Sequence, residues 1–95
     1  MLRERLTESL KSAMKAKDAR RSATVRLILA ALKDRDIAAR GSGDSEGLGE
    51  EEILHMMQTM IRQRRESIEM YKKGQRDDLV DQEEGEIRVI EEFLP

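Results

Sequence analysis

A row of cations runs along the second of four expected helices. Three of its members recur every seven residues, namely Arg26, Lys33 and Arg40. A fourth cation, Arg20, lies near the same edge of the helix. Because seven residues are close to two helical turns, these side chains share one exposed face. Such a row can contact the phosphates of a nucleic acid. A solvated helix face has the same pattern, Asp34 and Asp36 dilute the positive field, and the helix has no aromatic residue to stack on bases. Both interpretations stay open.

A single arginine interrupts the apolar stripe of the third helix. The stripe follows steps of four, three, four and three residues: Met57, Ile61, Arg64, Ile68 and Tyr71. If the third and fourth helices fold back about residues 74–76, Arg64 lies level with Glu83 and Glu86. We then expect an interhelical ion pair in which the aliphatic part of the arginine side chain is buried. The alternative is an arginine that binds an anion.

Other residue types give little support for catalysis. The chain has one histidine, His55, and no cysteine, which excludes a thiolate metal site, a cysteine nucleophile and a histidine-rich metal site. Neither a phosphate-binding GxxxxGK[ST] loop nor a GxGxxG motif after a strand is present. Paired carboxylates are frequent in the fourth helix, but no apolar pocket is indicated that would shift their pKa values. The sequence predicts no catalytic residue, no metal and no cofactor.

Length and composition indicate one small cytoplasmic domain. The 95 residues are 38% hydrophobic and 40% charged, against roughly 25% charged in an ordinary globular chain. No apolar run approaches the roughly 18 residues that span a bilayer, and the first residues lack the apolar core of a signal peptide. The net charge of −2 is divided unevenly, since residues 1–40 are basic and residues 41–95 acidic. We therefore expect no membrane contact.

Hydrophobic spacing predicts an all-α fold of four amphipathic helices in two antiparallel hairpins, at about 2–17, 19–40, 50–73 and 77–94. Asp18 is expected to cap the second helix and Gly49 the third, while Asp77 or Asp78 caps the fourth and Pro95 stops it. Four glycines within residues 41–49 predict a flexible linker without apolar anchors. Gly85, inside the fourth helix, predicts a close contact or a local weakness.

Several motifs together resemble the YqeY-like family, within the GatB/YqeY group. They are the run from Gln63 to Tyr71, the segments 76–81 and 83–87, and the ending Phe93-Leu94-Pro95. The second helix agrees as well. One departure is Gln75, which occupies a position where the family usually has glycine; we expect Gly74 to supply the turn instead.

The resemblance implies a bacterial, cytoplasmic helical protein linked to tRNA metabolism. In the family the chain normally continues past the Leu-Pro position into a second helical domain, similar to the tRNA-contacting tail of the amidotransferase B subunit. We expect that domain to be absent here, so residues 1–95 form the single N-terminal domain. The family is commonly labelled a carbon–nitrogen ligase with glutamine as amido-N-donor.

The expected function is a non-catalytic accessory or adaptor module associated with tRNA amidation or aminoacylation. Its partner would be tRNA or a tRNA-processing enzyme, bound weakly by this domain alone. Two alternatives remain: a helical protein–protein interaction module without a nucleic-acid role, and the ligase activity that the family label states.

Overall fold

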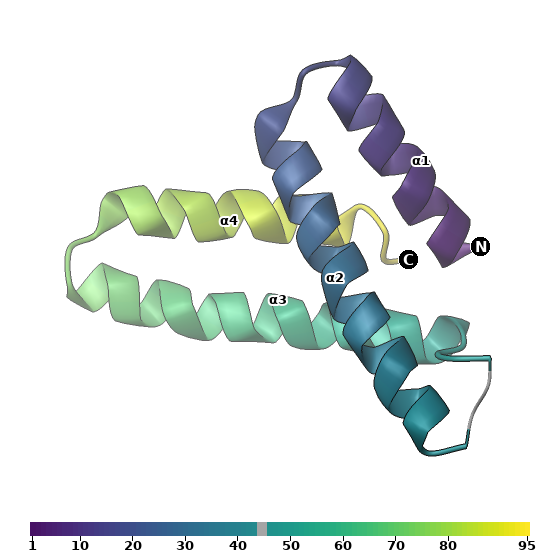
Figure 1. The fold of residues 1–95 in the computed structure, drawn as a ribbon. Coiled ribbons are helices and arrows are strands. Elements are labelled where there is room, and N and C mark those ends of the chain that lie inside the picture. Colours follow the sequence, from purple (N-terminus) through teal and green to yellow (C-terminus); the bar gives the residue numbers. More distant parts are fainter. Residues whose placement is uncertain (44–45) are drawn as a thin grey trace.

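The computed structural model describes residues 1–43 and 46–95. It has four helices: α1 (Leu2–Lys15), α2 (Ala19–Gly41), α3 (Glu50–Lys73) and α4 (Asp77–Glu91). The helices form two hairpins, and α2 crosses the α3–α4 hairpin near its open end (Figure 1). No strand occurs in the two described ranges. The predicted all-α class is confirmed.

The α1–α2 hairpin turns through a residue with left-handed backbone. Lys17 has φ 58°, and the amide of Asp18 donates to the carbonyl of Ala13 at 2.9 Å, which closes the end of α1. The Asp18 side chain then accepts a hydrogen bond from the amide of Arg21 at 3.1 Å. The predicted cap of α2 is confirmed.

The α3–α4 turn repeats this geometry, with two differences from expectation. Gln75, not Gly74, has the left-handed backbone (φ 58°), and the amide of Arg76 donates to the carbonyl of Tyr71 at 2.9 Å. Arg76 precedes α4 without a side-chain cap, so neither Asp77 nor Asp78 caps that helix. The side chain of Asp78 instead pairs with the guanidinium of Arg76 at 3.1 Å.

The end of α4 also differs from the prediction. The helix ends at Glu91, and residues 92–93 form a turn in which the amide of Phe93 donates to the carbonyl of Ile90 at 3.1 Å. Phe93 is buried in the core. The chain therefore leaves the helix after Glu91 to place this aromatic ring in the core. Since Glu91 is four residues before Pro95, the proline is not what stops α4.

The core lies where the two hairpins meet. Its fully buried side chains come from all four helices: Leu6, Val25, Ile28, Ile53, Met56, Met57 and Ile90. The Arg20 side chain of α2 lies against Gly85 of α4, where a Cβ would be 2.7 Å from Nη1 of Arg20. The close contact expected at Gly85 is present. Met14, near the end of α1, is 53% exposed.

The segment between α2 and α3 is anchored at both described ends. Gly41 belongs to α2, and the amide of Gly49 donates to the Glu52 side chain at 3.1 Å as α3 begins. Leu48 packs against the core, so the expectation of a linker without apolar anchors is wrong at this residue. Residues 44–45 of the predicted linker lie outside the described residues. Within the described part of the chain, no helix is long and apolar enough to cross a bilayer.

Candidate functional site: the outer face of α2

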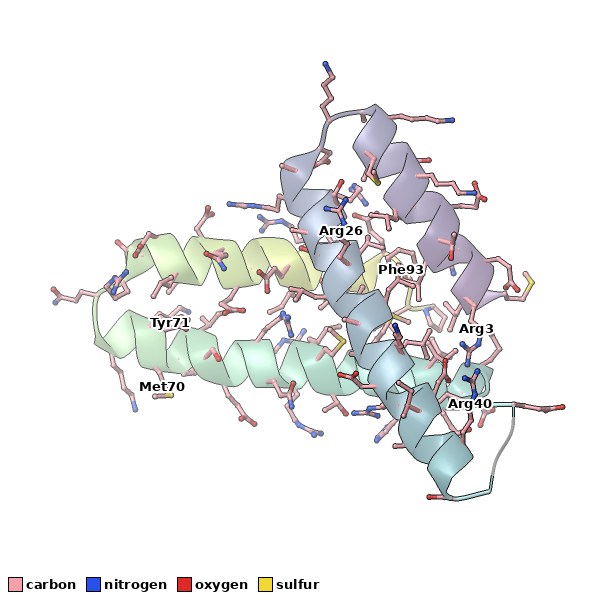
Figure 2. All side chains as sticks on the ribbon, viewed as in Figure 1. Arg3, Arg26, Arg40, Met70, Tyr71 and Phe93 are labelled. Carbon is pink, nitrogen blue, oxygen red and sulfur yellow. The ribbon has the colours of Figure 1, made fainter. Side chains whose placement is uncertain are left out.

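The outer face of α2 carries the predicted cations beside an exposed apolar strip. Arg26, Lys33 and Arg40 are all exposed, and Figure 2 shows Arg26 in the first half of α2 and Arg40 near its C-terminal end. Next to them, Leu27 is 45% exposed and Ile37 56% exposed. A helix on a protein surface normally turns a polar face to water. α2 instead has apolar residues on both of its faces.

The structure separates the fourth predicted cation from this row. Arg20 lies against α4, where its guanidinium is 3.6 Å from a carboxylate oxygen of Asp81 and its side chain covers Gly85. By contrast, Arg26, Lys33 and Arg40 form no ion pair within the described residues. Of the four predicted cations, Arg20 is therefore the one held in an ion pair within the described residues.

Asp36, expected to dilute this field, lies beside the row but is buried in the fold. Its carboxylate receives two hydrogen bonds from the guanidinium of Arg3, both at 2.8 Å, and one from the amide of Leu48 at 2.9 Å. Only 11% of its side chain is exposed. The Arg3 guanidinium, followed by the Leu48 amide, holds the pKa of this carboxyl well below its usual range. Asp36 follows Val25, Ile28 and Leu32 at helical spacing, a signal that could have placed it inside.

The second predicted site is Arg64, whose side chain bridges α3 and α4. Its Nε donates to Glu86 at 2.9 Å and its Nη1 to the carbonyl of Met60 at 3.1 Å, while Glu83 lies 3.9 Å away. The three charged side chains are between 14% and 17% exposed. Burial, and then the neighbouring carboxylate of Glu86, raise the pKa of Glu83 despite the arginine. This is the geometry of a half-buried structural ion pair.

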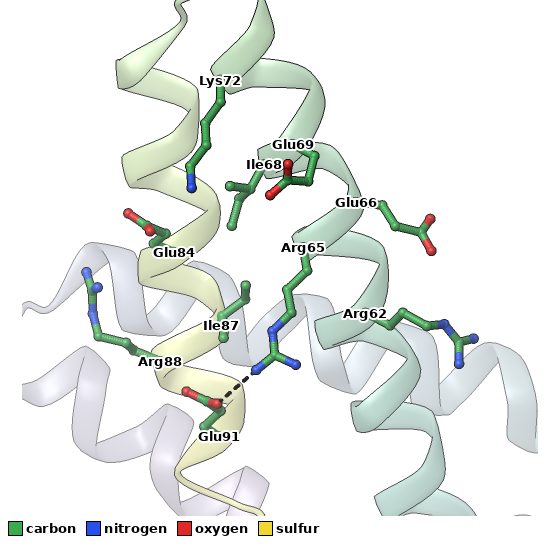
Figure 3. Close-up of a pocket in the computed structure, with 10 residues that line it drawn as sticks. All are labelled: Arg62, Arg65, Glu66, Ile68, Glu69, Lys72, Glu84, Ile87, Arg88 and Glu91. Carbon is green, nitrogen blue, oxygen red and sulfur yellow. Dashed lines mark ion pairs between the residues drawn. The ribbon is translucent and has the colours of Figure 1, made fainter.

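An open groove of about 550 Å³ lies between α3 and α4 on another face (Figure 3). Its apolar floor is formed by Ile68 and Ile87, and its walls carry as many acidic as basic side chains. Arg65 and Glu91 pair across it at 3.5 Å. Because its charges balance, the groove selects neither anions nor cations.

His55 lies in a separate shallow hollow, beside Arg35 and Glu52. The side chain is exposed. No group of three or more metal-binding side chains occurs in the part of the chain that the structure describes.

The fold and this surface define a small helical domain with an exposed, partly basic helix. A family model described as Yqey-like protein matches residues 3–95. The chain therefore belongs to the YqeY-like family, as its motifs predicted.

Curated relatives of this chain include yeast proteins named altered inheritance of mitochondria protein 41, mitochondrial. That of Lachancea thermotolerans is 39% identical over 89 residues, which is 94% of this chain and 46% of the relative. Those of Saccharomyces cerevisiae and Kluyveromyces lactis are 35% and 34% identical, over 94% and 93% of this chain and 46% and 45% of the relative. The chain spans about half the length of the curated relatives it matches.

These relatives contradict the prediction of a cytoplasmic protein, because their names place them in mitochondria. They also give no support to the expectation of a bacterial protein. The cytoplasmic prediction rested on composition and on the absence of an apolar segment, and neither feature distinguishes the cytoplasm from another aqueous compartment.

Proposed function

We propose that this domain is a non-catalytic accessory module of tRNA amidation or aminoacylation that contacts tRNA phosphates through α2. The observation that carries the proposal is the row Arg26, Lys33 and Arg40, three exposed cations that form no ion pair within the described residues. Other arginines of the domain, such as Arg3, Arg21 and Arg64, are paired with carboxylates. The choice of tRNA as the ligand follows what the resemblance to the YqeY-like family implies.

The spacing of the row suits a charged backbone. A step of seven residues along a helix is about 10.5 Å, so the three cations cover about 21 Å. Each cation that neutralises a phosphate releases condensed counterions, and three contacts give a slope of about −2 to −3 in log K against log salt concentration. Contacts to phosphate position a nucleic acid without reading its bases. Binding is therefore weak, sensitive to salt and indifferent to sequence.

The experiment is a titration of fluorescent tRNA with the chain at low salt, followed by fluorescence anisotropy. The variant Arg26→Glu/Lys33→Glu should abolish binding, because it reverses two of the three charges. The control Lys15→Glu/Arg62→Glu changes the net charge equally with two exposed cations on α1 and α3, and should retain most of the binding. If the α2 variant still binds tRNA as tightly as the control, the proposed surface is wrong.

The non-catalytic part of the proposal has a test of its own. Purified protein supplied with glutamine, ATP and a misacylated tRNA should show no amide transfer and no glutamine hydrolysis. Turnover that disappears when a single residue of this chain is substituted would contradict the proposal and favour the ligase activity of the family label.

A further inference from the structure

The exposed side of α2 has the spacing of a helix-packing seam. Its members follow steps of four, three, four and three residues: Ala23, Leu27, Ala30, Asp34 and Ile37. All five are exposed, although the opposite side of the same helix already packs on α1 and α4. Alternating steps of four and three are the repeat by which one helix packs along another. Alanine at two of the five positions allows a close approach of the two helix axes.

The free cations stand at a fixed place in this repeat. Arg26 and Lys33 each lie one residue before a seam position, Leu27 and Asp34, and Arg40 lies one residue before Gly41, where the next step of four falls. This is the flank where paired helices exchange ion pairs. Since no acidic residue in the described ranges pairs with them, the complementary surface is a helix with an apolar stripe and acidic residues beside it.

A second copy of this chain fits the seam poorly. If two α2 helices packed antiparallel, the two rows of cations would face each other, and like charges at facing flanks are destabilising. If they packed parallel, the two copies of Asp34 would meet within the seam, where desolvation of two like charges is costly. The charges on α2 therefore favour a different protein.

We propose that the outer face of α2 binds an amphipathic helix of a partner protein. The partner lays its apolar residues on Leu27 and Ile37 and its acidic residues on Arg26, Lys33 and Arg40. The inference stands on the apolar seam and goes beyond the proposed tRNA contact. Because the cations serve both ligands, the partner helix and tRNA compete for α2.

The probe is a synthetic helical peptide of three heptads with leucine at the seam positions and glutamate at both flanks. Repulsion between its glutamates keeps the peptide from pairing with itself. Labelled peptide is titrated with the full chain at low salt and its anisotropy recorded. A second peptide with lysine in place of glutamate should bind at least about tenfold more weakly, since it meets the same cations with like charge.

The variant Leu27→Gln/Ile37→Gln should weaken binding of the acidic peptide by at least about tenfold while leaving tRNA binding unchanged. Its matched control is Met70→Gln, which removes another exposed apolar side chain, 73% exposed on α3, and should change peptide affinity less than about twofold. Thermal unfolding of each variant verifies that the domain is folded. Since Leu27 and Ile37 contribute little to the core, the midpoints should stay close to that of the wild type.

Three results would overturn the inference. The first is that the acidic peptide does not bind, or binds the Leu27→Gln/Ile37→Gln variant as tightly as the wild type. The second is a wild-type dimer in sedimentation that this variant converts to monomer, which makes a second copy the occupant. The third is flotation with phosphatidylserine vesicles that the variant abolishes, which makes a lipid surface the occupant. The peptide, sedimentation and flotation measurements do not involve tRNA. The absence of tRNA binding would therefore contradict the proposed function and leave the proposed partner helix unaffected.

Discussion

Replacing Asp36 by asparagine should destabilise the domain more than the same substitution at Asp34, the other aspartate of α2. The carboxylate of Asp36 connects three segments: its own helix, Arg3 of α1, and Leu48 at the start of α3. The guanidinium of Arg3 also donates to the carbonyl of Leu48 at 2.8 Å. Asparagine keeps one acceptor oxygen, but it loses the charge and turns an amide group toward donors.

The magnitude follows from burial of the two partners. Breaking a buried ion pair by removing one partner costs about 3–5 kcal/mol. Here the aspartate is 11% exposed but the arginine 38%, so water can partly solvate Arg3 after the change. We therefore expect a loss of about 2–3 kcal/mol in the free energy of unfolding. In a domain of this size such a loss lowers the thermal midpoint by about 10–20 °C.

The assay is urea denaturation followed by circular dichroism, with Asp34→Asn as the matched control. Asp34 lies on the same helix but is exposed and pairs with no described cation, so its change should cost less than about 0.5 kcal/mol. Because the pKa of Asp36 is lowered in the folded state, its stabilisation is present above the ordinary aspartate value of 3.8 and is lost as the pH falls below it. The wild type should lose more stability than the variant between about pH 4 and pH 2.

The reasoning fails if Asp36→Asn unfolds within about 0.5 kcal/mol of Asp34→Asn at pH 7. It also fails if the wild type and the Asp36→Asn variant have the same dependence of stability on pH below 4. Either outcome would mean that the three segments are held by apolar packing alone.

Three other changes test the remaining contacts. A double-mutant cycle between Arg64→Ala and Glu86→Ala in urea should give a coupling energy of about 1–2 kcal/mol, and a coupling near zero would reopen the anion-binding interpretation. Gln75→Gly should raise the free energy of unfolding by about 1 kcal/mol, because glycine adopts the left-handed backbone without steric cost; a loss would contradict this. Gly47→Ala should lower the thermal midpoint more than Gly43→Ala. Both residues have positive φ, but only at Gly47 would the new Cβ clash, since it would lie 2.4 Å from Oδ1 of Asp36. Equal losses would exclude the steric contribution.

The helices and the Asp18 and Gly49 caps could be predicted because their signals are local. Apolar spacing fixes which face is buried, and the capping residues act on amides within three positions of themselves. The end of α4 could not be predicted in this way. Phe93 is drawn out of helical geometry by the core formed from other helices, and no feature of residues 91–95 alone indicates that contact.

The candidate site was predicted in part, for a related reason. Helical spacing correctly placed Arg26, Lys33 and Arg40 on an exposed face. The same spacing places Arg20, six residues before Arg26, about 120° around the helix from it. Arg20 should therefore have been left out of the row, and in the structure its side chain lies against Gly85 of α4. The apolar strip of Leu27 and Ile37 was missed, since a helix with apolar residues on two faces does not indicate from its own sequence which face the fold buries.

The division into two hairpins has a consequence for the order of folding. Each hairpin joins helices that are neighbours in sequence, so its contacts close short loops at small entropic cost. The crossing of α2 over α4 brings together residues much farther apart, such as Arg20 and Gly85. We expect the hairpins to form early and the crossing to form late. Substitutions at the crossing should then accelerate unfolding and leave the rate of folding almost unchanged.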